Sequence, residues 1–143
     1  MKATELMIGD WVCLKDDTKY ELPQKVDGIL TDDISLEGEG FLGGVDGLIR
    51  PIPITPEILE KNGFYDRNTQ WYYKRFGSYV CFDIAISLVY REIEVSKVCG
   101  AGTDCEEEEY GSAIAFGNDI CVHTLQHALR LCGLNEIADN FKV

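Results

Sequence analysis

The chain has 143 residues, of which 45% are hydrophobic, and this content is sufficient for one packed domain or two small ones. It carries 13 basic and 25 acidic side chains, which gives a net charge of −12. The acidity is uniform, because residues 1–50 and residues 51–143 each have six more acidic than basic groups. Nucleic acids and anionic membranes bind through lysine and arginine, so this charge argues against both as partners.

The N-terminal segment and the cysteines indicate the compartment. Residues 1–12 lack the apolar core of a signal peptide, and no apolar run is long enough to span a bilayer. We therefore expect a cytoplasmic protein that does not associate with a membrane. Six cysteines are present without a CxxC pair, and in a reducing compartment we expect free thiols.

The first part of the chain has the pattern of short strands separated by turns. Apolar stretches bounded by glycine and aspartate predict strands at residues 8–15, 24–30 and 32–38, and the proline-containing residues 48–54 are expected to be extended. The glycine-rich residues 38–47 are expected to form a loop. Strands this short are typical of a small, curved, barrel-like unit, and an SH3-like barrel is one form of it.

A short helix is predicted at residues 55–63. Thr55 has a side chain suited to capping, Pro56 fits the first helical position, and Gly63 can adopt the left-handed C-terminal cap. Three apolar segments and a further strand then predict an antiparallel β-meander that leads into a C-terminal helix. These strands are expected at residues 70–76, 78–86, 88–97 and 112–118.

The C-terminal helix contains the sequence HTLQH, one residue away from the HExxH motif of zinc hydrolases. Thr124 occupies the position of the glutamate that acts as the general base in that motif. With about 100° between residues, Leu125 and Leu129 lie on an apolar stripe, whereas His123 and His127 lie on the opposite, polar face. We therefore expect two solvated histidines, with a functional metal site as the weaker alternative.

Cys121 and Cys132 flank this motif and would complete a four-ligand zinc set if thiols and imidazoles converged. On a helix that includes Cys121, the thiols and imidazoles point in opposite directions, so we expect two buried core cysteines. A zinc site would require a later start of the helix, which would free Cys121.

Two further motifs carry less information. The sequence GEGFLG at residues 38–43 has the glycine spacing of dinucleotide-binding loops, but no helix is predicted directly after it. The sequence DCEEEEY at residues 104–110 places five acids in an expected loop, which is solvated or serves as a contact for a basic partner.

The strand WYYKRF interleaves aromatic and basic side chains. In a strand, Trp71, Tyr73 and Arg75 share one face, and the three residues that alternate with them share the other. One face is expected to pack inward. Trp71, Tyr73 and Arg75 are therefore weak candidates for binding a protein or, with less support from the charge, a nucleic acid.

Together these elements predict an α+β protein. A small curved β-barrel-like unit is followed by a short helix and an antiparallel β-meander, with the C-terminal helix packed on the meander. The units are expected at residues 1–51 and 52–143, with a soft boundary near Pro51–Pro53. A single compact domain stays open as the alternative.

Three segments carry a resemblance: KATELMIGDWV at residues 2–12, PIPITPEILEKNGF at residues 51–64 and VHTLQHALRLCGL at residues 122–134. In this order they resemble segments of small uncharacterised proteins from Bacteroides-type bacteria, their prophages and their conjugative elements. The acidic residues 104–110 have no counterpart in that pattern. The resemblance implies a mobile-element context and carries no catalytic role.

These observations favour a non-enzymatic protein-interaction module of a mobile genetic element or prophage. We assign no catalytic residue, cofactor or metal, and a protein partner is expected. Two alternatives stay open: a metal-dependent hydrolase that uses His123 and His127, and nucleic-acid binding through the N-terminal β unit. The partner, any substrate and the oligomeric state do not follow from the sequence.

Overall fold

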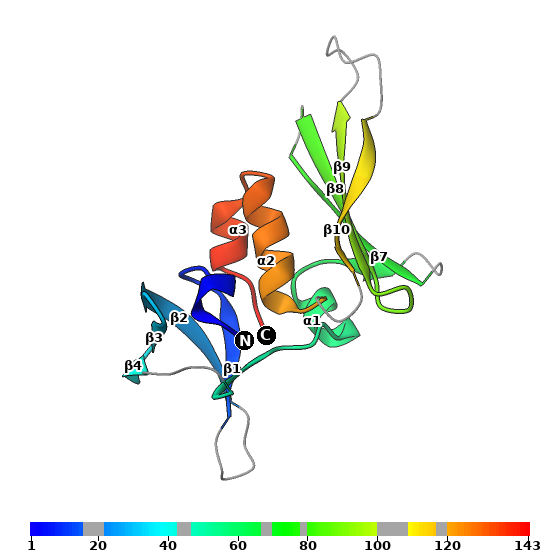
Figure 1. Ribbon diagram of the computed structural model, residues 1–143. Coiled ribbons are helices and arrows are strands. Elements are labelled where there is room, and N and C mark those ends of the chain that lie inside the picture. Colours follow the sequence, from blue (N-terminus) through cyan, green and yellow to red (C-terminus); the bar gives the residue numbers. More distant parts are fainter. Residues whose placement is uncertain (16–21, 43–46, 67–69, 78–79, 100–108, 117–119) are drawn as a thin grey trace. The chain divides into compact units, whose positions relative to one another are not determined.

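The computed structural model describes residues 1–15, 22–42, 47–66, 70–77, 80–99, 109–116 and 120–143 (Figure 1). Within these ranges, only the backbone is described for residues 80, 98–99 and 109–116. The fold is α+β, as predicted, and consists of two antiparallel five-stranded sheets and short helices. None of the helices described is long and apolar enough to cross a membrane.

The chain divides into two compact units. The first unit comprises Met1–Pro53, Cys121–Phe141 and Val143, and the second comprises Ile54–Ile120 and Lys142. The chain passes from the first unit to the second after Pro53, close to the boundary predicted near Pro51–Pro53. It returns to the first unit at Cys121, whereas the sequence predicted one unit over residues 52–143.

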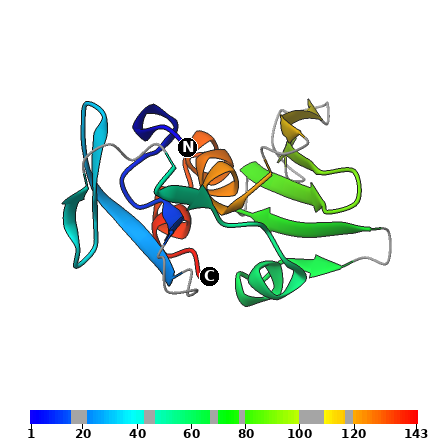
Figure 2. The same ribbon diagram turned by 60° about the horizontal axis from the view of Figure 1, so that its bottom comes forward.

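The sheet of the first unit has the strand order β4-β3-β2-β1-β5. Its strands are β1 (Trp11–Leu14), β2 (Leu22–Leu30), β3 (Asp33–Leu36), β4 (Gly40–Leu42) and β5 (Ile49–Pro51), and a short 3-10 helix, η1 (Ala3–Glu5), precedes them. Figures 1 and 2 show β2, β3 and β4 as a twisted antiparallel meander. Among the residues described, β4 and β5 do not pair with each other, so the sheet is open rather than a closed barrel.

The apolar core of the first sheet follows from the alternation in its strands. Its fully or nearly fully buried members are Ala3, Leu6, Val12, Val26, Ile34, Leu36 and Ile49. The prediction of a loop at residues 38–47 is partly wrong, because β4 lies within this range. Gly38 and Gly40 have positive φ angles of 87° and 75°, which lets the chain turn back and pair β4 with β3.

Two C-terminal helices, α2 (Val122–Leu131) and α3 (Asn135–Asp139), complete the first unit. Leu125 and Leu129 have no exposed surface, which confirms the predicted apolar stripe. The sequence grouped this helix with the meander, whereas in the structure α2 groups with the N-terminal sheet. The backbone N–H of Trp11 in β1 donates to the buried side-chain oxygen of Gln126 at 2.9 Å.

The second unit begins with α1 (Pro56–Lys61), which has the predicted caps. The backbone N–H of Ile58 donates to Thr55 Oγ1 at 3.3 Å, and Gly63 has a φ of 78°. The predicted antiparallel meander follows, in the order β10-β9-β8-β7-β6. Its strands are β6 (Tyr65–Asp66), β7 (Trp71–Phe76), β8 (Val80–Ser87), β9 (Glu92–Cys99) and β10 (Glu109–Phe116).

One face of this second sheet holds the core of the second unit. Ile84, Ile86 and Ile93 have no exposed surface, and Ile86 pairs with Ile93 across β8 and β9. Phe76 at the end of β7 is also buried, and its ring packs edge-on against Phe64 with centroids 6.3 Å apart. The opposite face of β7, β8 and β9, here called the outward face, is only partly exposed, because Ala85 and Ser87 on it are buried.

Candidate functional site

The outward face of the second sheet contains the three candidate binding residues of the WYYKRF strand. Trp71, Tyr73 and Arg75 pair with Ser87, Ala85 and Asp83, respectively, so all three lie on one face, as predicted. The residues that alternate with them are directed to the core. Phe76 is buried, and the Lys74 ammonium donates to the Asn62 backbone oxygen. Burial lowers the pKa of Lys74.

Strand β9 adds two carboxylates to this outward face. Glu92 pairs with Ser87 and Glu94 pairs with Ala85. The sheet therefore has two cross-strand rows, Trp71–Ser87–Glu92 and Tyr73–Ala85–Glu94. In each row a small side chain on β8 separates an aromatic ring on β7 from a carboxylate on β9.

Tyr90 lies in the turn between β8 and β9, and its ring lies next to that of Trp71. The two ring centroids are 6.3 Å apart with an interplanar angle of 35°. The backbone N–H of Tyr90 donates to Ser87 Oγ at 3.0 Å, which fixes the turn. Tyr90 is 65% exposed. We call the set Trp71, Tyr73, Tyr90, Glu92 and Glu94 the aromatic–acidic face.

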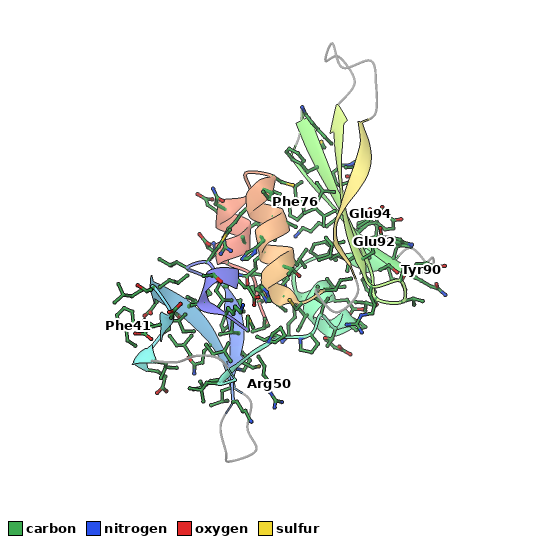
Figure 3. The ribbon with its side chains drawn as sticks, in the orientation of Figure 1. Phe41, Arg50, Phe76, Tyr90, Glu92 and Glu94 are labelled. Carbon is green, nitrogen blue, oxygen red and sulfur yellow. The ribbon has the colours of Figure 1, made fainter. Side chains whose placement is uncertain are left out.

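The labelled side chains in Figure 3 agree with this assignment, because Tyr90, Glu92 and Glu94 lie on the side of the sheet away from Phe76. Tyr65 on β6 pairs with Tyr73 and is 47% exposed, so it extends the aromatic row toward the edge of the sheet. The aromatic–acidic face thus combines the exposed ring of Tyr90 and the half-buried rings of Trp71 and Tyr73 with two carboxylates, and the small side chains at its centre are buried.

The charges on this face are unbalanced. Burial raises the pKa of Glu94, and the negative charge of Glu92 raises it further. None of the ion pairs seen among the described residues involves Glu92 or Glu94. Arg75 is held by Asp83 through two hydrogen bonds of 2.6 and 2.7 Å, which raise its pKa. The guanidinium therefore neutralises Asp83 rather than the two glutamates.

The other two motifs contribute little. Residues 104–108 of the acidic segment lie outside the described residues, and only the backbone is described for residues 109–110, which belong to β10. The GEGFLG segment contains β4, and the next described element after it is strand β5. The helix that a dinucleotide-binding loop requires is therefore replaced by a strand.

The histidines of HTLQH lie in the first unit. The prediction that both are solvated is wrong for His123, which is buried, whereas the side chain of His127 is 23% exposed and contacts Asp10. His127 Nε2 lies 2.7 Å from Asp10 Oδ2, and Arg130 Nη1 lies 2.5 Å from Asp10 Oδ1. Asp10 has no exposed surface. Burial raises the pKa of this carboxyl, but the hydrogen bonds from His127 and Arg130 lower it by more, so the pKa lies below its ordinary value.

His123 is also buried, with 8% of its surface exposed. Its Nδ1 lies 3.0 Å from the sulfur of Cys121. The helical wheel missed this pairing because Cys121 is the N-cap of α2 and has extended backbone angles. The helix starts one residue later than expected, and the thiol consequently turns toward the imidazole. Burial keeps this pair of groups away from solvent.

The histidines and cysteines do not converge into a larger ligand set. In the part of the chain that the structure describes, no three His, Cys, Asp or Glu side chains form a group that could hold a metal. Burial raises the pKa of Cys132, which lies at the far end of α2. Cys13, Cys81, Cys121 and Cys132 are not part of a disulfide.

Three members of the aromatic–acidic face were not predicted from the sequence, namely Tyr90, Glu92 and Glu94. The alternation of Glu92 and Glu94 with Ile93 was visible and indicated an outward-facing pair. The register that brings this pair alongside Trp71 and Tyr73 depends on the lengths of two hairpins. No protein-family model, curated protein or solved structure matches this chain.

Proposed function

We propose that this protein is a non-enzymatic protein-interaction module of a mobile genetic element or prophage, and that it binds its partner through the aromatic–acidic face. The observation that carries the proposal is the neighbouring pair of Trp71 and Tyr90 rings, which are tilted with centroids 6.3 Å apart, and of which Tyr90 is 65% exposed on a turn. Tryptophan and tyrosine are enriched among the residues that dominate binding energy in protein interfaces.

The arrangement of the rings supports this role. The backbone N–H of Tyr90 donates to Ser87 Oγ, so the ring lies on a short turn that is anchored to the sheet. A tyrosine ring that already lies against a neighbouring ring loses less conformational freedom when a partner covers it. The mobile-element context rests on the resemblance of the three sequence segments.

Binding of a nucleic acid is less well supported on this face. Glu92 and Glu94 would repel phosphates, and the guanidinium of Arg75 is already paired with Asp83. The hydrolase alternative would need imidazoles that are open to a metal. His127 is bound to Asp10 and His123 to Cys121.

We also propose that the first unit is SH3-like. Its support is the strand order β4-β3-β2-β1-β5, with a bulge between Val26 and Gly28 where β2 passes from one pairing partner to the next. An SH3-like fold by itself would not assign a function.

The interaction is tested with a tyrosine variant and a neighbour in the same turn. Proteins captured from the native host by the wild-type chain are purified, and their affinities are measured by calorimetry for wild type, Tyr90→Ala and Val89→Ala. Val89 is 62% exposed and makes a matched control. We expect Tyr90→Ala to weaken the affinity by about thirtyfold, as loss of a central tyrosine does. Equal affinity of both variants would contradict the proposal.

A further inference from the structure

We infer that the first unit has an interaction surface of its own, formed by Phe41 and Leu30 on its sheet, and that this surface binds a basic protein segment in which an apolar side chain stands between lysine or arginine residues. We call these two side chains the Phe41 patch. The inference goes beyond the proposed function, because the Phe41 patch lies on a different sheet from the aromatic–acidic face.

The two side chains of the Phe41 patch are exposed. Phe41 in β4 and Leu30 in β2 each have 62% of their surface accessible. Ser35 in β3 pairs with Gly28 on one side and with Phe41 on the other, so these residues form one cross-strand row. Leu30 lies two residues after Gly28 in β2 and therefore shares the face of this row. The neighbouring Ile34 is fully buried in the core, which places the Phe41 patch on the opposite face of the sheet.

The Phe41 ring is supported by the sheet beneath it. A Cβ atom added at Gly28 would lie 3.5 Å from Phe41 Cζ and 3.3 Å from Ser35 Cβ. The ring thus extends over Ser35, which is buried, toward the backbone of Gly28. In Figure 3, Phe41 lies at the margin of the first unit that is remote from α2. A ring that already rests on the sheet and exposes the rest of its surface loses little freedom when a partner covers it.

Carboxylates border the Phe41 patch. Residues 26–42 contain five acidic side chains and no basic one, and the acidic residues are Asp27, Asp32, Asp33, Glu37 and Glu39. All of them except Asp33 are exposed, and Asp33 pairs with Leu30 across β2 and β3. Lys25, the residue before this segment, is directed elsewhere, because its ammonium donates to the backbone oxygen of Asp139 at 2.6 Å. The Phe41 patch is therefore an apolar centre with an acidic rim.

Charge complementarity selects the partner. A neutral apolar segment that covered the Phe41 patch would remove water from the acidic rim without supplying cations. A second copy of the chain would bring another molecule with a net charge of −12 against this rim. A basic segment with a central apolar side chain places that side chain on the Phe41 ring and its cations on the rim. This is the usual division of a protein interface into an apolar centre and a polar rim.

The probes are capped pentapeptides. The first has leucine between two pairs of lysines, and in two matched peptides serine replaces the leucine or glutamine replaces the lysines. The full chain is labelled with ¹⁵N, and the backbone amides of Gly28, Leu30, Ser35 and Phe41 are followed during titration. We expect the lysine–leucine peptide to shift these amides, and each matched peptide to bind at least about tenfold more weakly.

Two single variants test the ring. Phe41→Ser removes the aromatic side chain, and Leu22→Ser removes an apolar side chain that is 59% exposed at the opposite end of β2. We expect the first change to weaken binding of the lysine–leucine peptide by at least about tenfold and the second by less than about twofold, as for residues at the centre of an interface and outside it.

Two double variants separate the rim from the overall charge. Glu37→Gln/Glu39→Gln removes two carboxylates of the rim, and Glu60→Gln/Glu136→Gln removes two exposed carboxylates from α1 and α3. Both change the net charge equally. We expect the first variant to lose about fivefold in affinity and the second less than about twofold. This pair tests the inference even if Phe41→Ser does not fold, because it leaves the apolar side chains unchanged.

Three results would overturn the inference. One is equal binding of the lysine–leucine peptide and either matched peptide, and another is an equal loss in the two double variants. The third is a shift of the same amides when the chain alone is concentrated, which would assign the Phe41 patch to a second copy. None of these results bears on Tyr90 and its partner, so failure of this inference is distinguishable from failure of the proposed function.

Discussion

His127 and Asp10 are separated by 117 positions in the sequence, and His127 Nε2 lies 2.7 Å from Asp10 Oδ2. The backbone N–H of Met7 donates to the same oxygen at 2.8 Å, and Arg130 occupies the other oxygen. A carboxylate without exposed surface thus has a partner for each of its oxygens. This cluster joins the segment before β1 to α2 and closes the first unit.

Asp10→Asn should destabilise the protein by about 3–5 kcal/mol, because it removes the buried anion of the largely buried Arg130 guanidinium and leaves it only the exposed Asp139. Urea-induced unfolding followed by circular dichroism measures this free energy. The control is Asp139→Asn, since Asp139 also pairs with Arg130, at 3.1 Å, but its side chain is 57% exposed. Its loss should cost no more than about 1 kcal/mol. Equal effects of the two changes would contradict the role assigned to Asp10.

The contribution of Asp10 should depend on pH. Its pKa in the folded protein lies below the ordinary value of 3.8, so the charged form is favoured by folding. The stability that it contributes is present above pH 3.8 and is lost as the pH falls through the folded-state pKa. The difference in unfolding free energy between wild type and Asp10→Asn should therefore shrink between pH 5 and pH 2. A constant difference over this range would exclude the mechanism.

Leu125→Ala should cost about 2–5 kcal/mol, as removal of a fully buried leucine side chain does. Leu125 has no exposed surface. Leu131 lies on the same helix but is 79% exposed, so Leu131→Ala should change stability by no more than about 0.5 kcal/mol. Denaturant melts of both variants test the phase of the helix, and a larger effect at Leu131 would refute it.

Glu94→Gln should stabilise the folded protein slightly at pH 7. The pKa of Glu94 is raised by burial and by Glu92, so folding favours its neutral form, and the penalty from the charged form grows as the pH rises. Glutamine has nearly the same shape and no charge. Thermal melts should show a higher Tm for the variant at pH 7, and the gain should decrease toward pH 4. A lower Tm at pH 7 would indicate that Glu94 has a stabilising cation.

The sequence by itself determined the local structure of this protein. Thr55 and Gly63 marked the limits of α1 because caps act through backbone groups a few residues away. Alternation identified β7, β8 and β9 and placed Trp71, Tyr73 and Arg75 on one face, since successive side chains of a strand point in opposite directions. The apolar stripe of α2 was likewise predicted from the helical spacing of its apolar residues.

Only the tertiary structure determined which residues the polar side of α2 contacts and which residues lie together on the second sheet. Helical periodicity reports the apolar side of α2, but it cannot report that Asp10, far away in the chain, packs against the side that carries His127. A one-residue shift in the start of α2 turned the thiol of Cys121 toward His123. The aromatic–acidic face likewise exists only because the pairing register, which depends on hairpin geometry, sets Glu92 and Glu94 in line with Trp71 and Tyr73.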